Sequence, residues 1–316
     1  MALPQRITPI RRSYNQFVAD ETMEDYALRF TASTARKFSG RAVANTAFGA
    51  TSFLALEAIG ATITLAYGPA NAVAAILSVA VLIALTAGPI AYVAARYGVD
   101  IDLLTRAAGF GYIGSTITSL IYASFTFIFF ALEASIFANM LHELFGIPLH
   151  LGYVLTTLGI IPLAAYGITF ISRFQAWSQP LWLALNFLPL LFLAVHPGLL
   201  HGWAHFRGAQ AVGFALLPFG ACASVIVSLI AQIGEQADYL RFLPQPKGRP
   251  GWRWWAALLA AGPGWVLPGA IKLLAGSVLG VLTLGLGHDA EQAAQPILLY
   301  QSAYGLVLPP RASLLA

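Results

Sequence analysis

The stretch that decides the fold is VANTAFGATSFLALEAIGATITLAYG, residues 43–68, an apolar run with a single acid, Glu57, near its middle. A helix that rises about 1.5 Å per residue needs about 20 apolar residues to cross a bilayer core of about 30 Å, and this run is long enough. It also contains Gly49 and Gly60, and glycine is more frequent in membrane helices than in soluble ones. The stretch therefore predicts a membrane-spanning helix.

Seven similar runs follow, so about eight transmembrane helices are predicted. They are Ala70–Tyr97, Ile113–Phe145, Leu149–Gly167, Ile168–Val195, Ala209–Ala231, Trp254–Gly285 and Ala290–Leu308, the last barely long enough to span. Only 9% of the residues are charged and 58% are hydrophobic, whereas soluble domains carry about 25% charged residues. The fold class is therefore an all-α membrane protein and not a soluble domain.

The distribution of basic residues predicts the orientation. With a cytoplasmic N-terminus and runs that alternate in direction, every one of the 17 Lys and Arg residues except Arg207 and Lys272 falls on the cytoplasmic side. This asymmetry obeys the positive-inside rule and predicts a multi-pass protein of the inner (plasma) membrane. Membrane topology therefore explains the basic residues. The lipid bilayer is the expected partner, and no nucleic-acid partner is expected.

The loops are short, which indicates one membrane domain. We expect residues 1–42 to form a cytoplasmic N-terminal segment, residues 43–308 a multi-pass transmembrane domain, and residues 309–316 a short, aberrant tail after Pro309-Pro310. All six histidines fall at the outer ends of runs and are interpreted as interfacial loop residues. We expect no metal site and no cofactor. Since the sequence shows no nucleophile–base pair, an enzyme is not expected either.

Three ionisable side chains lie within apolar runs, where charges are costly and by default mark a functional site. They are Glu57, Glu133 and Lys272. The carboxylates could bind a cation, carry a proton or accept hydrogen bonds from an N–H-rich substrate. Lys272 could pair with one of the acids or contact the substrate. The residues alone leave these alternatives open.

Helix-breaking residues indicate where the spans are interrupted. Gly49 and the stretch 52–56 lie in the first run, while Pro218 and Gly220 lie early in the sixth. Interrupted helices expose backbone groups at mid-membrane, where secondary transporters hold ions and substrates. Gly276 and Gly280 form a small-xxx-small pattern, which favours close packing of helices.

Three segments resemble the nucleobase:cation symporter-1 family, which includes purine, cytosine, allantoin and hydantoin permeases. The segment VANTAFGA at 43–50 is similar to the start of its first helix, and RAAGFGYIG at 106–114 resembles the approach to its third. The most specific match is QIGEQADYLRF at 232–242, which looks like its Asp-aromatic-x-Arg-aromatic signature after the sixth helix. The resemblance covers roughly residues 24–308.

The resemblance implies a LeuT-type (APC-like) inverted-repeat bundle, incomplete here because later helices are missing. It implies a small nucleobase-like substrate and a coupling ion, Na⁺ or H⁺, beside Phe53, Leu56 and Glu57. Phe129 matches the family's stacking aromatic, usually Trp, and Glu133 matches its amide-reading Gln. Two further sets complete the expected site: substrate contacts from Phe129, Glu133, Glu57 and Gln232, and gate or structural roles for Glu235, Asp238, Arg241 and Lys272.

Two functions of different classes follow. The first is a secondary active transporter that couples nucleobase-like heterocycles to a cation. Within this function, the chain is either an active transporter or a truncated, inactive one. The second is a membrane input domain that senses a small molecule, because permease-like domains of this kind also occur fused to sensor histidine kinases. Protein partners are not predicted.

Overall fold

The computed structural model describes residues 30, 31, 36, 38–165, 167–194, 197–246 and 248–306 of the 316-residue chain. Most of the expected N-terminal segment and all of the expected tail lie outside these residues. Every element within them is helical. The helices are α2 (Gly40–Gly49), α3 (Ala55–Tyr97), α4 (Ile101–Thr105), α5 (Gly111–Phe145), α6 (Leu149–Ala165), α7 (Gly167–Ala194), α8 (Pro197–Ala204), α9 (Leu216–Val227), α10 (Gln232–Leu240), α11 (Trp252–Ala261), α12 (Val266–Gly285) and α13 (Pro296–Gly305).

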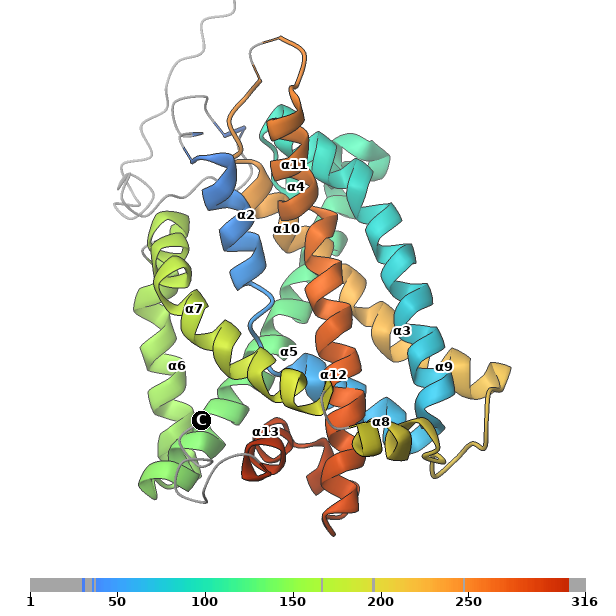
Figure 1. Ribbon diagram of the computed structural model, residues 1–316. Helices are drawn as coiled ribbons and strands as arrows, with labels where there is room; N and C mark the ends of the chain where they lie inside the picture. Colours follow the sequence, from blue (N-terminus) through green and yellow to red (C-terminus); the bar gives the residue numbers. More distant parts are fainter. Residues whose placement is uncertain are drawn as a thin grey trace, which may run out of the picture.

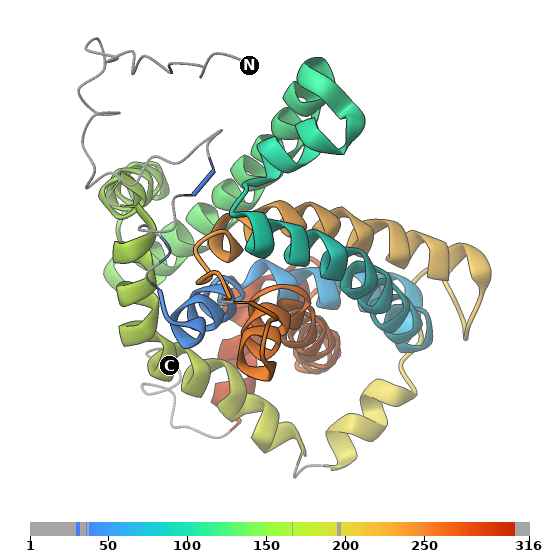
Figure 2. The ribbon, with the colours of Figure 1, turned by 90° about the horizontal axis from the view of Figure 1, so that it is seen from above.

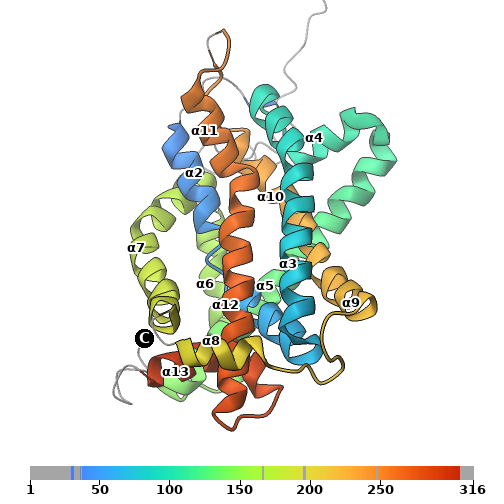
Figure 3. The same cartoon turned by 45° about the vertical axis from the view of Figure 1, so that its right-hand side comes forward.

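Helices α3 and α12 lie side by side along the long axis of the molecule, with α6 and α7 to one side and α9 to the other (Figures 1 and 3). Seen from above, α2 and α11 lie in the middle, between α7 and α9 (Figure 2). Helix α11 lies at one end of the bundle, whereas α8 and α13 lie at the other. The bundle thus separates the two ends that the charge distribution assigns to opposite sides of the membrane.

The predicted spans are recovered in part as long helices. By length and hydropathy, four helices of the described chain can cross a membrane: Ala55–Tyr97, Ile101–Phe145, Leu216–Leu240 and Pro263–Gly285. A fifth is counted if α6 and α7, which are bent by 115°, form one broken span. The last apolar run differs from expectation, because α13 has only 10 residues. At about 15 Å it is too short to cross the bilayer core.

The first and second apolar runs meet inside α3. Its 43 residues would measure about 65 Å if straight, roughly twice the thickness of the bilayer core. Gly68, at φ 80°, interrupts the helix and is followed by Pro69. Because that backbone conformation is open to glycine and strained for other residues, Gly68 marks the point where the first run ends and the second begins.

The first span is broken, as the sequence predicted, and the sixth is broken at a different place. α2 ends at Gly49 and α3 begins at Ala55, so residues 50–54 connect α2 to the first part of α3 within one span. In the sixth span, α9 begins close to Pro218 and Gly220, and the α-helix instead changes to a 3₁₀-helix at Ser228–Ala231. That segment contains neither glycine nor proline, so sequence patterns do not reveal it.

Three glycines bring α12 against α3 at backbone distance. A Cβ added at Gly60 would overlap the backbone carbonyl of Leu273, and one added at Gly276 would overlap that of Glu57. A Cβ added at Gly280 would lie 2.7 Å from the Cβ of Ala61, which is too close for two side chains. The small-residue pattern therefore forms a packing face, as predicted. This contact also sets the depth at which Lys272 meets the first span.

We expect Gly276→Ala to lower the unfolding free energy by about 1–3 kcal/mol, because the new methyl group forces α12 away from α3. The matched control is Gly285→Ala at the end of the same helix, where an added Cβ meets nothing within 4 Å. Thermal unfolding of both variants in detergent measures the difference. Equal melting temperatures for the two variants would contradict the close packing of these helices.

Candidate functional site

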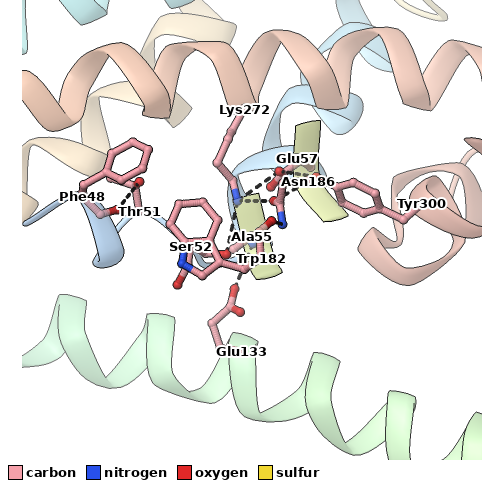
Figure 4. A network of polar contacts seen from close by, with 10 residues as sticks. All are labelled: Phe48, Thr51, Ser52, Ala55, Glu57, Glu133, Trp182, Asn186, Lys272 and Tyr300. Carbon is pink, nitrogen blue, oxygen red and sulfur yellow. Dashed lines mark hydrogen bonds and ion pairs between the residues drawn. The ribbon is translucent and has the colours of Figure 1, made fainter. Parts of the chain in front are cut away.

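A cluster of polar side chains lies in the apolar interior, where α3, α7, α12 and α13 meet (Figure 4). The ammonium nitrogen of Lys272 lies 3.1 Å from Oε1 of Glu57, and their side chains are 2% and 0% exposed. Lys272 also donates to Oδ1 of Asn186 at 3.0 Å and to the backbone oxygen of Ser52 at 3.3 Å. The hydroxyl of Tyr300 lies 2.8 Å from Oε1 of Glu57 and 3.1 Å from Oδ1 of Asn186.

The structure has Lys272 in the first of the two arrangements that the sequence left open, paired with an acid. The lysine pairs with an intramembrane acid, Glu57, and the pair is closed off from solvent. Further hydrogen bonds offset part of the cost of burying an ion pair. Asn186 and Ser52 accept from Lys272 and Tyr300 contacts Oε1 of Glu57, whereas Oε2 of Glu57 has no hydrogen-bond partner among the described residues.

Glu133 contacts the C-terminal side of the helix break, where α3 begins. Its Oε1 accepts a hydrogen bond from the backbone N–H of Ala55 at 2.9 Å. Ala55 is the first residue of α3, whose N-cap residue Leu54 offers no side-chain hydrogen bond. The first backbone N–H groups of a helix lack intrahelical partners and carry partial positive charge, so a carboxylate is favoured there. Glu133 of α5 thus caps α3 across the broken span.

A cavity of about 410 Å³ lies beside Glu133. It extends between the helix break, α5 and the junction of the 3₁₀ segment with α10. Its apolar walls include a cluster of phenylalanines: the ring centroids of Phe53 and Phe129 are 5.4 Å apart with the rings edge-on, and those of Phe125 and Phe129 are 4.6 Å apart. The full lining is Ala50, Phe53, Tyr122, Phe125, Thr126, Phe129, Phe130, Glu133, Gln232 and Glu235.

The side-chain oxygen of Gln232 is the main unsatisfied polar group of this cavity. Gln232 is 2% exposed, and within the part of the chain that the structure describes its Oε1 has no hydrogen-bond partner. A buried polar atom without a partner is costly, and each one needs a physical explanation. A bound molecule with an N–H group would provide the missing donor.

The structure brings together five of the residues that the sequence proposed for the site. Phe53, Phe129, Glu133, Gln232 and Glu235 all line the cavity.

The other proposed residues lie elsewhere. Glu57 and Lys272 form the buried pair outside the cavity lining, and Leu56 packs into the apolar core. Asp238 belongs to α10 and Arg241 follows its last residue, and α10 lies near α11 (Figure 1). There Arg241 forms an ion pair with Asp100 at 3.1 Å, and Asp238 accepts a hydrogen bond from Tyr122 at 3.4 Å.

A second buried arginine, Arg36, connects the helices at this end of the bundle by hydrogen bonds. Arg36 donates to the backbone oxygens of Arg241 and Ala95, both at 2.9 Å. Burial lowers the pKa of the Arg36 guanidinium from its ordinary value. Arg36 is thus anchored to the ends of α3 and α10.

Several positions were missed or misjudged from the sequence. Asn186 and Tyr300 were missed, and only Asn186 carried a signal, as the one amide in an otherwise apolar stretch from 181 to 195. His142, His150 and His201, interpreted as loop residues, are parts of α5, α6 and α8, and His201 lies one turn from His205, with ring centroids 4.1 Å apart. Tyr300 could not be found because aromatic residues are common in membrane helices.

These features define a class: a LeuT-type helical membrane bundle in which the first span is interrupted beside a ligand-sized cavity. The fold is similar to that of Mhp1, a nucleobase-cation-symport-1 family transporter, in a closed conformation with bromovinylhydantoin bound. The TM-score is 0.64 at 16% sequence identity, and the match covers 94% of this chain and 72% of Mhp1. No protein-family model matches the sequence, and no curated protein does. The likeness confirms the fold that the resemblance implied.

Proposed function

We propose that this chain is the core of a secondary active transporter that binds a small, flat, nucleobase-like heterocycle in the 410 Å³ cavity. The observation that carries this proposal is the unpartnered, buried oxygen of Gln232 in a cavity with phenylalanine walls. Pockets for small ligands are mostly apolar with a few convergent polar groups, and this one has that composition. The phenylalanine faces favour a planar ring, and Gln232 and Glu133 favour ring N–H groups.

The fold supports transport as the activity. The interrupted first span lies beside the cavity, and secondary transporters use such discontinuous helices to bind ions and substrates near the middle of the membrane. Mhp1, which has a similar fold, is a transporter and binds a hydantoin. We infer that transport here is coupled to Na⁺ or H⁺, in the inner (plasma) membrane, with the N-terminus in the cytoplasm as the basic residues predict.

The proposal is tested by equilibrium binding of radiolabelled nucleobases, hydantoins and allantoin to the purified chain, followed by uptake into liposomes. We expect saturable binding of one class of heterocycle and uptake of the same compound. Binding without uptake would overturn the transport proposal in favour of a sensing domain. An absence of binding by the whole panel would overturn the heterocycle assignment.

Within this experiment, Phe129→Ala should weaken heterocycle binding about 5- to 10-fold. The bound heterocycle loses an aromatic partner whose stacking contributes about 1 kcal/mol beyond its buried area. The matched control is Phe127→Ala on the same helix, since Phe127 is 71% exposed and does not line the cavity. Binding isotherms of the two variants give the ratio directly. An equal effect of both substitutions would place the ligand elsewhere.

A further inference from the structure

The ammonium group of Lys272 is surrounded by oxygen atoms from three separate elements. These are the carboxylate of Glu57 in α3 at 3.1 Å, the amide oxygen of Asn186 in α7 at 3.0 Å, and the backbone oxygen of Ser52 in the helix break at 3.3 Å. We call these three oxygens the oxygen cage. Lys272 reaches it from α12 and is 2% exposed.

The composition of the oxygen cage is that of a site for a monovalent cation. A carboxylate, an amide oxygen and a backbone carbonyl are the ligands that hard cations prefer. The Ser52 carbonyl is available because residues 50–54 are not helical, and carbonyls at broken membrane helices coordinate such ions in secondary transporters. The Tyr300 hydroxyl lies against the oxygens of both Glu57 and Asn186 and helps to fix their positions.

We propose that the ammonium of Lys272 is a built-in cation that occupies the oxygen cage and thereby excludes free Na⁺, so that removal of this side chain opens a Na⁺ site there. The close contact of Gly60 and Gly276 with the facing helix holds the lysine at this depth. Without the ammonium, Glu57 would be a buried carboxylate with no compensating charge, which is strongly destabilising, and a cation bound in the vacated space would restore the balance. The proposal concerns the ion and is independent of the heterocycle.

The consequence for transport is specific. The oxygen cage needs no Na⁺ from solution in the native chain, since its positive charge is covalently attached. Any dependence of heterocycle binding on Na⁺ must then arise outside the oxygen cage. Lys272 thus determines which ions this part of the molecule accepts.

The test compares melting temperatures in NaCl and in choline chloride at equal ionic strength. Purified wild type should melt at the same temperature in both salts. Lys272→Ala leaves a space beside Glu57, and it should melt about 3–5 °C higher in NaCl at a concentration near ten times its Kd for Na⁺.

Two controls separate an ion site from a general effect of salt. Lys272→Met fills the same space with an uncharged side chain and should show no preference for Na⁺. Lys272→Ala combined with Glu57→Gln keeps the space and removes the negative charge, so its response to Na⁺ should fall sharply.

A Lys272→Ala chain that responds to the two salts as the wild type does would overturn the proposal. If that variant is too unstable to purify, a fluorescent-protein fusion in crude detergent extract reports its folded fraction by gel filtration. Absence of a folded peak in NaCl as well as in choline chloride would show that Na⁺ does not replace the ammonium, and would also overturn the proposal.

Discussion

Glu57→Gln is expected to lower the unfolding free energy by about 3–5 kcal/mol, the largest effect on stability that we expect from one substitution. The change keeps the size and shape of the side chain and removes its charge. The ammonium of Lys272 then lies in the apolar interior with neutral oxygens alone, 3.0 Å from Asn186 and 3.3 Å from Ser52. Titration of the folded protein in micelles with a denaturing detergent measures the loss.

The second half of this experiment removes both charges. Glu57→Gln with Lys272→Met should be more stable than Glu57→Gln alone, because no uncompensated charge remains in the interior. Glu291→Gln is the matched control, since Glu291 is exposed, and it should change stability by less than about 0.5 kcal/mol. If the double variant loses as much unfolding free energy as Glu57→Gln and Lys272→Met lose together, the two side chains do not interact.

Glu133→Gln is expected to weaken binding of N–H-bearing heterocycles by about 10- to 100-fold, the largest effect on ligand affinity that we expect. A hydrogen bond to a charged group contributes about 1.5–3 kcal/mol, and the amide keeps an acceptor but loses the charge. The fold should persist, because an amide oxygen can still accept the hydrogen bond from the backbone N–H of Ala55. Isotherms with a panel of heterocycles measure the change.

The same panel shows whether Glu133 selects the ligand. Heterocycles that present an acceptor toward residue 133 should lose less affinity than those that present N–H groups, because the Gln amide can also donate. Glu143→Gln, at an exposed position of the same helix, should leave all affinities unchanged. A uniform loss over the whole panel would indicate a structural effect of Glu133 and not recognition of the ligand.

The sequence predicted the class of fold and pointed to several candidate site residues because intramembrane charge and helix breakers leave local signals. Glu57, Glu133 and Lys272 were visible as ionisable residues in apolar runs, and Gly49 marked the broken first span. A resemblance to a permease family added Phe129 and Gln232, which the structure places in one cavity.

What the sequence left open depends on how helices pack. The choice of Glu57 as the partner of Lys272 follows from the register of α12 on α3, which Gly60 and Gly276 set by backbone contact. Asn186 and Tyr300 join the cluster from α7 and α13. No local pattern encodes that meeting, because these helices are far apart in the sequence. The 3₁₀ segment at Ser228–Ala231 likewise has no composition that distinguishes it from regular helix.

The central claim, that a small heterocycle occupies the cavity beside α5, is tested most directly by protection of a single introduced cysteine. Thr126 lines the cavity, and the native Cys222 is 0% exposed, so the parent chain should react little with a maleimide. The control is Thr116→Cys, an exposed position of the same helix outside the cavity lining. The heterocycle that binds best in the panel should slow the labelling of Thr126→Cys at least about fivefold, as expected at a ligand concentration of four or more times its Kd, and leave Thr116→Cys unchanged. Unchanged labelling of Thr126→Cys at a saturating concentration of that compound would contradict the account.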